Sequence, residues 1–124
     1  MSVSRRLSGS RWGRAALAAV ALLVGGLVPS PLGRHPEFDR VGPDKALHFL
    51  GHAGFAVALT DALAGDDVGD WPAACLAVAG STALGALVGV LQRPVPGREP
   101  ERADLVAGVL GSLAAALVWL GRRR

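Results

Sequence analysis

Three long runs without a charged residue divide the chain. They cover Ala15–Gly33, Trp71–Gln92 and Leu105–Gly121, with 19, 22 and 17 residues respectively. About 20 apolar residues at ~1.5 Å each cross the ~30 Å hydrocarbon layer of a membrane as a helix. A soluble helix as long as Trp71–Gln92 would show a polar stripe along one side, and this run contains no charge at all. Each run therefore predicts a membrane-spanning helix.

A shorter run, Ala46–Thr60, predicts a fourth span. Its 15 residues are apolar or neutral at pH 7, and the polar residues on either side bring it to membrane length. Prolines lie between the runs, where they end or precede helices. The sequence thus predicts an all-α fold, a four-helix transmembrane bundle with short loops. The helices are expected at about 13–31, 44–64, 71–92 and 103–121.

The length of 124 residues allows one domain. We assign 1–13 to a basic N-terminal tail, 14–121 to a single four-span membrane domain and 122–124 to a basic C-terminal tail. The first run has an alternative interpretation, because basic residues before an apolar stretch are also typical of a signal peptide. The nearest small-x-small cleavage pattern, Val28-Pro29-Ser30, is followed directly by Pro31. We therefore favour a retained span.

The composition is that of a membrane protein. Hydrophobic residues make up 51% of the chain and charged residues 19%, and 17 residues are glycine. The 13 Lys and Arg lie in short clusters between the apolar runs. A nucleic-acid-binding protein would gather them on one face, so we expect membrane lipids and no nucleic acid as partners. The single cysteine, Cys75, excludes an intramolecular disulfide and a cysteine-cluster metal site, and we expect it to pack in the core.

The basic residues also predict an orientation. With four spans, both termini and the second loop share one side, which carries seven Lys or Arg against six on the other side. By this small margin, the positive-inside rule places the N-terminus and the C-terminus in the cytoplasm. The chain is then a multi-pass protein of the cell membrane.

Small residues spaced four apart predict close helix packing. They form Gly85-x-x-x-Gly89 in the third predicted span, and Gly108-x-x-x-Ser112 and Gly111-x-x-x-Ala115 in the fourth. Such faces let helix backbones approach one another closely. Chance spacing in a chain rich in Ala and Gly is the alternative. A homo-oligomer is also left open.

Polar residues share one face at the start of the second predicted span. Asp44 behind Pro43 has the position of a helix N-cap, and Lys45 that of a side chain reaching the membrane interface. His48 and His52 have the i, i+4 spacing of metal ligands, but no third ligand lies nearby in sequence, so we expect no metal. His52 falls well inside the bilayer, where a hydrogen bond across a helix interface is expected.

The loop before the fourth span supplies a second polar group. Gln92 and Asp104 bound this loop, and Arg98 follows Pro96-Gly97, a turn that holds it in place. In a four-span chain this loop lies on the same side as the start of the second span. We therefore expect one cluster at that end of the bundle, made of Asp44, Lys45, His48, Gln92, Arg98 and Asp104. Within it, we expect Arg98 to contact Asp44 or Asp104.

These two segments resemble the signatures of a known family. Asp44-Lys45-Ala46-Leu47-His48-Phe49 looks like the D-K-x-x-H-F signature of VanZ-like integral membrane proteins. The segment 91–98, Leu-Gln-Arg-Pro-Val-Pro-Gly-Arg, and the helix that follows from Asp104 resemble that family's L-Q-x-x-x-P-G-R … D-x-x-x-N-x-x-G. The order and spacing agree over roughly residues 15–120.

Three positions depart from the pattern of that family. Gly89 stands where an acidic residue is usual, Gly108 where Asn is usual, and His52 where an aromatic residue is usual. The resemblance implies an accessory protein of the cell envelope, associated with glycopeptide (teicoplanin) resistance and without a defined reaction. An activity that depends on the missing carboxylate or carboxamide would be lost here.

Two functional hypotheses follow. In the first, the protein binds the phosphate-bearing head group of a membrane lipid, which Arg and Lys recognise well, through Lys45, Gln92, Arg98 and Asp104. In the second, an intramembrane enzyme acts on a lipid-linked envelope precursor. His48 is then the general acid or base, Asp44 orients it and Arg98 steadies developing charge. We favour the first, and neither needs a cofactor.

Overall fold

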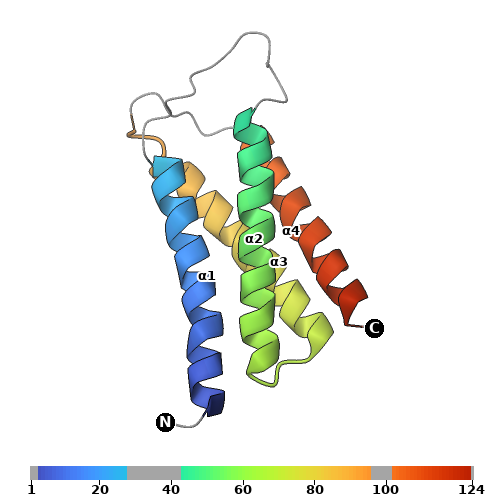
Figure 1. Ribbon diagram of the computed structural model, residues 1–124. Helices are drawn as coiled ribbons and strands as arrows, with labels where there is room; N and C mark the ends of the chain where they lie inside the picture. The colour runs from blue at the N-terminus through green and yellow to red at the C-terminus, as the bar shows by residue number, and fades with distance from the viewer. Residues whose placement is uncertain (1–2, 28–42, 96–101, 124) are drawn as a thin grey trace.

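The computed structural model describes residues 3–27, 43–95 and 102–123. Over these residues the chain forms four helices and no strand: α1 (Val3–Leu27), α2 (Pro43–Gly65), α3 (Asp70–Leu91) and α4 (Arg102–Arg122). Figure 1 shows them as one bundle in which helices that follow one another along the chain run antiparallel, whereas α2 and α4 run parallel. The predicted all-α four-helix bundle is confirmed, and the bounds of the last three helices lie within a residue of those expected.

Three of these helices are long and apolar enough to cross a membrane, namely α2 from Ala46, α3 and α4. The first helix differs from its predicted bounds, because it begins at Val3 and includes the basic segment assigned to a tail. Residues 3–13 contain no proline, so nothing in the sequence ends the helix where the charges begin. Residues 28–31 of the predicted first span lie outside the described residues, and a fourth span stays a prediction.

Helix α2 lies at the centre of the bundle. It makes its most extensive contact with α4 and also packs against α1 and α3. Helix α3 contacts α4 as well, and α1 touches α3 over a smaller area. Figure 1 shows α1 and α4 on opposite sides of α2, with both chain termini toward the end where α2 turns into α3.

The small residues of α4 form its packing face. Gly108, Gly111, Ser112 and Ala115 are all buried. A Cβ atom on Gly111 would overlap the backbone carbonyl of Phe49, so the backbones of α2 and α4 lie in direct contact there. The predicted close packing of the fourth span is confirmed. Of the predicted pair in the third span, Gly85 faces neighbouring helices, whereas a Cβ atom on Gly89 would meet nothing within 4 Å.

The outer surface of the bundle is apolar. Large aliphatic side chains are exposed on every helix, among them Leu17, Leu47, Leu76, Leu110 and Leu117. The buried hydrophobic residues are mainly alanines, with Phe55, Val88 and Trp119 as the large members. A surface of this kind suits lipid, where packing rather than hydrophobic burial holds helices together. Cys75 is exposed on α3, which corrects the expectation that it packs in the core.

Candidate functional site

We call the end of the bundle where α2 and α4 begin the motif end. His48 and Asp104 meet here, with 3.5 Å between His48 Nε2 and Asp104 Oδ2, and both side chains are mostly buried. The contact forms because α2 and α4 start at the same end and pack closely along their lengths. Asp104 lies in the first turn of α4, where the helix dipole favours a carboxylate.

The side chains of three predicted site residues lie outside the described part of the structure. Asp44 and Lys45 belong to the first turn of α2, but their side chains lie outside the described part of the structure. Arg98 lies wholly outside the described residues. The predicted contact of Arg98 with a carboxylate therefore stays a prediction.

Gln92 joins two helices. It follows the last residue of α3, is 3% exposed, and its Nε2 donates a hydrogen bond of 2.9 Å to the carbonyl of Gly26. Carbonyls in the last turn of a helix lack an intrahelical partner, so this bond satisfies one near the end of α1. The approach is close, since a Cβ atom on Gly26 would overlap Val88. The Gln92 amide N–H group thus fastens α1 to α3.

A cavity of about 270 Å³ opens at the motif end. Among the described residues, its polar wall consists of His48, His52, Gln92, Arg93, Arg102 and Asp104. Leu22, Val88, Val90 and Leu105 are among the apolar residues that line it. Gly89 also lines the cavity, and its lack of a side chain helps to keep that space open. The two arginines are exposed, so the cavity combines a cationic rim with an apolar interior.

His52 lies in the cavity wall, one helical turn deeper than His48. The two imidazole rings are nearly parallel, with centroids 6.4 Å apart and an interplanar angle of 16°. His52 Nδ1 lies 2.7 Å from Ser81 Oγ of α3, and Ser81 Oγ lies 2.7 Å from Ser112 Oγ of α4. This is the hydrogen bond across a helix interface that the sequence predicted for His52. Both serines are fully buried.

Two glycines make room for His52. A Cβ atom on Gly108 would lie 2.8 Å from His52 Cδ2, and one on Gly85 would lie 3.2 Å from His52 Cε1. The imidazole therefore occupies the space that a side chain at position 108 would need. Two departures from the VanZ-like pattern, His52 and Gly108, are thus sterically linked.

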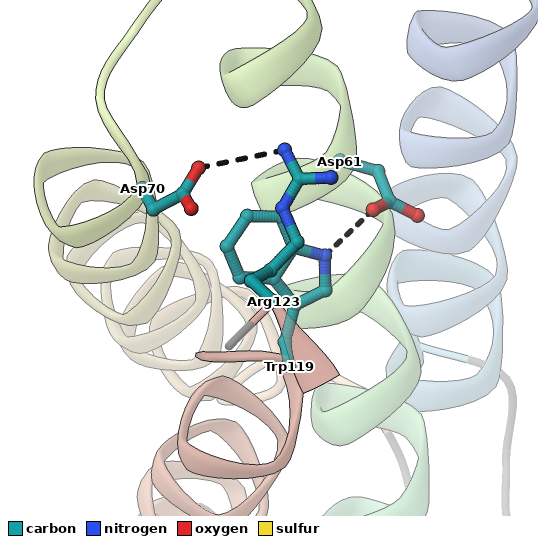
Figure 2. A network of polar contacts seen from close by, with 4 residues as sticks. All are labelled: Asp61, Asp70, Trp119 and Arg123. Carbon is teal, nitrogen blue, oxygen red and sulfur yellow. Dashed lines mark hydrogen bonds and ion pairs between the residues drawn. The ribbon is translucent and has the colours of Figure 1, made fainter. Parts of the chain in front are cut away.

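The opposite end of the bundle holds a second polar cluster, which the sequence analysis missed. Trp119 Nε1 donates a hydrogen bond of 2.6 Å to Asp61 Oδ1, and the Arg123 guanidinium lies 4.9 Å from the centre of the Trp119 ring. Arg123 Nη2 also lies 3.5 Å from Asp70 Oδ1. Figure 2 shows these four side chains joining α2, α3 and α4. Trp119 and Asp61 each lie near a helix end, and Trp is frequent at membrane interfaces. These two residues could have indicated the cluster from the sequence.

Helix α1 is fastened at this end too. Trp12 Nε1 donates a hydrogen bond of 2.7 Å to Asp66 Oδ2 in the turn between α2 and α3. In that turn Asp67 adopts φ 65°, a conformation that Asp tolerates better than most residues. Among the described residues, no group of three or more His, Cys, Asp or Glu could hold a metal ion.

The chain matches no protein-family model, no curated protein and no solved structure. Its fold and candidate site define a class: a helical bundle of membrane type with a partly polar cavity at one end. The resemblance to VanZ-like proteins rests on the two sequence motifs alone.

Proposed function

We propose that this chain is a VanZ-like multi-pass protein of the cell membrane that binds the phosphate-bearing head group of a lipid at the motif end. The observation that carries the proposal is the cavity there. It places Arg93 and Arg102 beside an apolar interior that includes Leu22 and Val90. A lipid has the same two-part chemistry, with an anionic head and an apolar chain. Both termini are cytoplasmic in this proposal.

The charges of the cavity favour an anion. The described lining contains two positively charged residues, Arg93 and Arg102, and one carboxylate, Asp104. Its net charge is therefore +1 when both histidines are neutral. Arg binds phosphate through two parallel hydrogen bonds, and it is the cation best suited to this geometry. Because α3 ends and α4 begins here, both arginines fall at the membrane boundary, where lipid phosphates lie.

Lipid binding by the purified full-length protein tests this proposal. Arg93→Gln/Arg102→Gln removes two positive charges from the cavity rim. We expect the affinity for phosphate-bearing lipids to fall at least about tenfold. Arg14→Gln/Arg122→Gln is the matched control, because it removes the same charge from two exposed residues away from the cavity. Equal loss in both variants would show that the protein responds to overall charge and not to this site.

The enzyme hypothesis has one observation in its favour. His48 contacts Asp104 beside a cavity, which is the arrangement that a general acid or base needs. Among the described cavity residues, however, none is a serine, threonine or cysteine that could act as a nucleophile. Incubation of the protein with a lipid-linked pyrophosphate distinguishes the two. A product that His48→Gln abolishes supports the enzyme, whereas binding without any product supports the binding module.

A further inference from the structure

The contact between His48 and Asp104 places a titratable group in the wall of the cavity. His48 Nε2 lies 3.5 Å from Asp104 Oδ2, and 17% of the His48 side chain is exposed. Both residues line the cavity. Histidine is the side chain that ordinarily changes charge between about pH 5 and pH 8. The charge of the cavity wall can therefore depend on pH through His48.

The described charged and titratable groups around His48 come from α2, from the residues after α3 and from α4. On α2, the ring of His52 lies nearly parallel to that of His48. Asp44 and Lys45 begin the same helix, with side chains outside the described part of the structure. Helix α1 adds none at this end, because residues 15–27 carry no charge. The other described groups line the cavity and are Arg93, Arg102 and Asp104.

Of the two histidines on α2, His48 is the one placed to hold a proton. A carboxylate stabilises an imidazolium ion beside it, and Asp104 lies beside His48. His52 is 5% exposed and lies 2.7 Å from Ser81 Oγ in the interior of the bundle, where a charge is costly. The two ring centroids are only 6.4 Å apart, so a charge on one ring opposes a charge on the other. The first proton that this pair takes up therefore goes to His48.

Protonation of His48 changes the charge that an anion meets in the cavity. The net charge of the described lining is +1 with neutral histidines and +2 with a protonated His48. A cavity of about 270 Å³ is roughly 8 Å across, so a charge on its wall acts on an anion inside it without touching it. An anion therefore binds more tightly when His48 is charged, and a bound anion in turn favours the charged form.

We infer that pH regulates lipid binding at the motif end: a phosphate-bearing lipid binds more tightly as the pH falls, because His48 becomes positively charged. This inference rests on the proposed function and adds its regulation. In that function both termini are cytoplasmic, and the motif end is the end of the bundle opposite them (Figure 1). The cavity then faces the outside of the cell, so its occupancy responds to the pH there.

Binding of phosphatidylglycerol to the purified full-length protein at two pH values tests this inference. Its phosphodiester lacks the second ionisation that a phosphate monoester undergoes near pH 6, so a change in affinity comes from the protein. We expect binding to be about three- to tenfold tighter at about pH 5.5 than at about pH 7.5, the effect of one partly screened charge. Glycerophosphoglycerol, the same head group without chains, is expected to bind far more weakly at both pH values.

Two variants identify the residue that is responsible. His48→Gln removes the titratable ring and keeps a polar side chain, and we expect it to bind phosphatidylglycerol equally at both pH values. His35→Gln is the matched control, since His35 is the third histidine of the chain and lies outside the described residues. We expect His35→Gln to keep the full pH dependence. Loss of the pH dependence in His35→Gln, with its retention in His48→Gln, overturns the assignment to His48.

Proton uptake gives a second measurement, should His48→Gln fail to fold. Binding that favours a charged His48 takes up protons at about pH 6.5, so the heat of binding depends on the ionisation enthalpy of the buffer. Calorimetry on the His35→Gln protein in two buffers measures this uptake without a contribution from His35. Uptake of protons supports the inference, and a heat of binding that is the same in both buffers overturns it.

The outcomes separate this inference from the proposed function. Equal or weaker binding of phosphatidylglycerol at the lower pH, with the effect of Arg93→Gln/Arg102→Gln intact, overturns the regulation and leaves the head-group site standing. Failure of this lipid to bind at either pH overturns the head-group site as well. Binding of glycerophosphoglycerol as tightly as the lipid overturns the lipid assignment and identifies a site for a soluble phosphate.

Discussion

At the end of the bundle where α2 turns into α3, polar side chains close on one another, whereas at the motif end they surround a cavity. Trp119, Asp61, Arg123 and Asp70 form direct contacts that tie three helices together (Figure 2). At the motif end His48 and Asp104 are also in contact. The cavity beside them stays open at Gly89, where a Cβ atom would meet nothing within 4 Å. Polar residues at one end thus join helices, whereas those at the other end line an open cavity.

The difference predicts that the two ends respond in opposite ways to substitution. Changes at the end that holds Trp119 are expected to weaken the fold and leave ligand binding by the folded protein intact. Changes that fill the motif-end cavity are expected to weaken binding and leave the fold intact.

The largest expected effect is on stability, from Trp119→Ala. This change removes a large buried side chain and leaves Asp61 without its indole partner. We expect the free energy of unfolding to fall by about 3–5 kcal/mol, measured by denaturant titration in detergent micelles. Trp71→Ala is the matched control, because Trp71 is 60% exposed. A similar loss in both variants would contradict the role given to Trp119.

The next effect concerns the fit between His52 and Gly108. Gly108→Ala places a methyl group 2.8 Å from His52 Cδ2, and we expect it to cost about 1–3 kcal/mol of unfolding free energy. Gly54→Ala is the control, since Gly54 is exposed and a Cβ atom there meets nothing within 4 Å. In a His52→Ala background, Gly108→Ala should cost much less. An unchanged cost in that background would show that the two positions are not coupled.

A smaller effect is expected from Arg123→Gln. The ion pair with Asp70 is long, and its side chains are 53% and 43% exposed, so little of its attraction survives in water. Together with the lost contact to the Trp119 ring, we expect a change of about 0.5–1 kcal/mol in unfolding free energy. Arg122→Gln removes the same charge one residue earlier and should have almost no effect. A large loss for Arg123→Gln would mean that the pair is far better shielded than its exposure indicates.

The fold could be predicted because its signals are local. Uncharged runs set the helices, and prolines with charged residues set their ends, so the predicted span at 71–92 became α3 over Asp70–Leu91. The shared location of His48 and Asp104 followed from connectivity alone, since α2 and α4 begin at the same end. The start of α1 was missed because a helix can continue into a charged segment when no proline stops it.

The details of the site could not be predicted, because they depend on how each helix is rotated against its neighbours. Arg93 was not among the predicted site residues, yet it lines the cavity together with Arg102. Gln92 was expected to bind a ligand, which stays a prediction, but the hydrogen bond from its amide N–H group to Gly26 could not be foreseen. The chain from His52 through Ser81 to Ser112 joins three helices, and nothing in the spacing of these residues along the sequence reveals it.

The central claim is that the cavity at the motif end binds a phosphate-bearing lipid, and Gly89→Leu tests it most directly. A Cβ atom at position 89 meets nothing within 4 Å, so the leucine side chain can enter the cavity without displacing a helix. Gly54→Leu makes the same substitution at an exposed position away from the cavity. The account predicts that Gly89→Leu reduces lipid binding at least tenfold while the protein unfolds at the same denaturant concentration as Gly54→Leu. Full binding by Gly89→Leu would contradict the account.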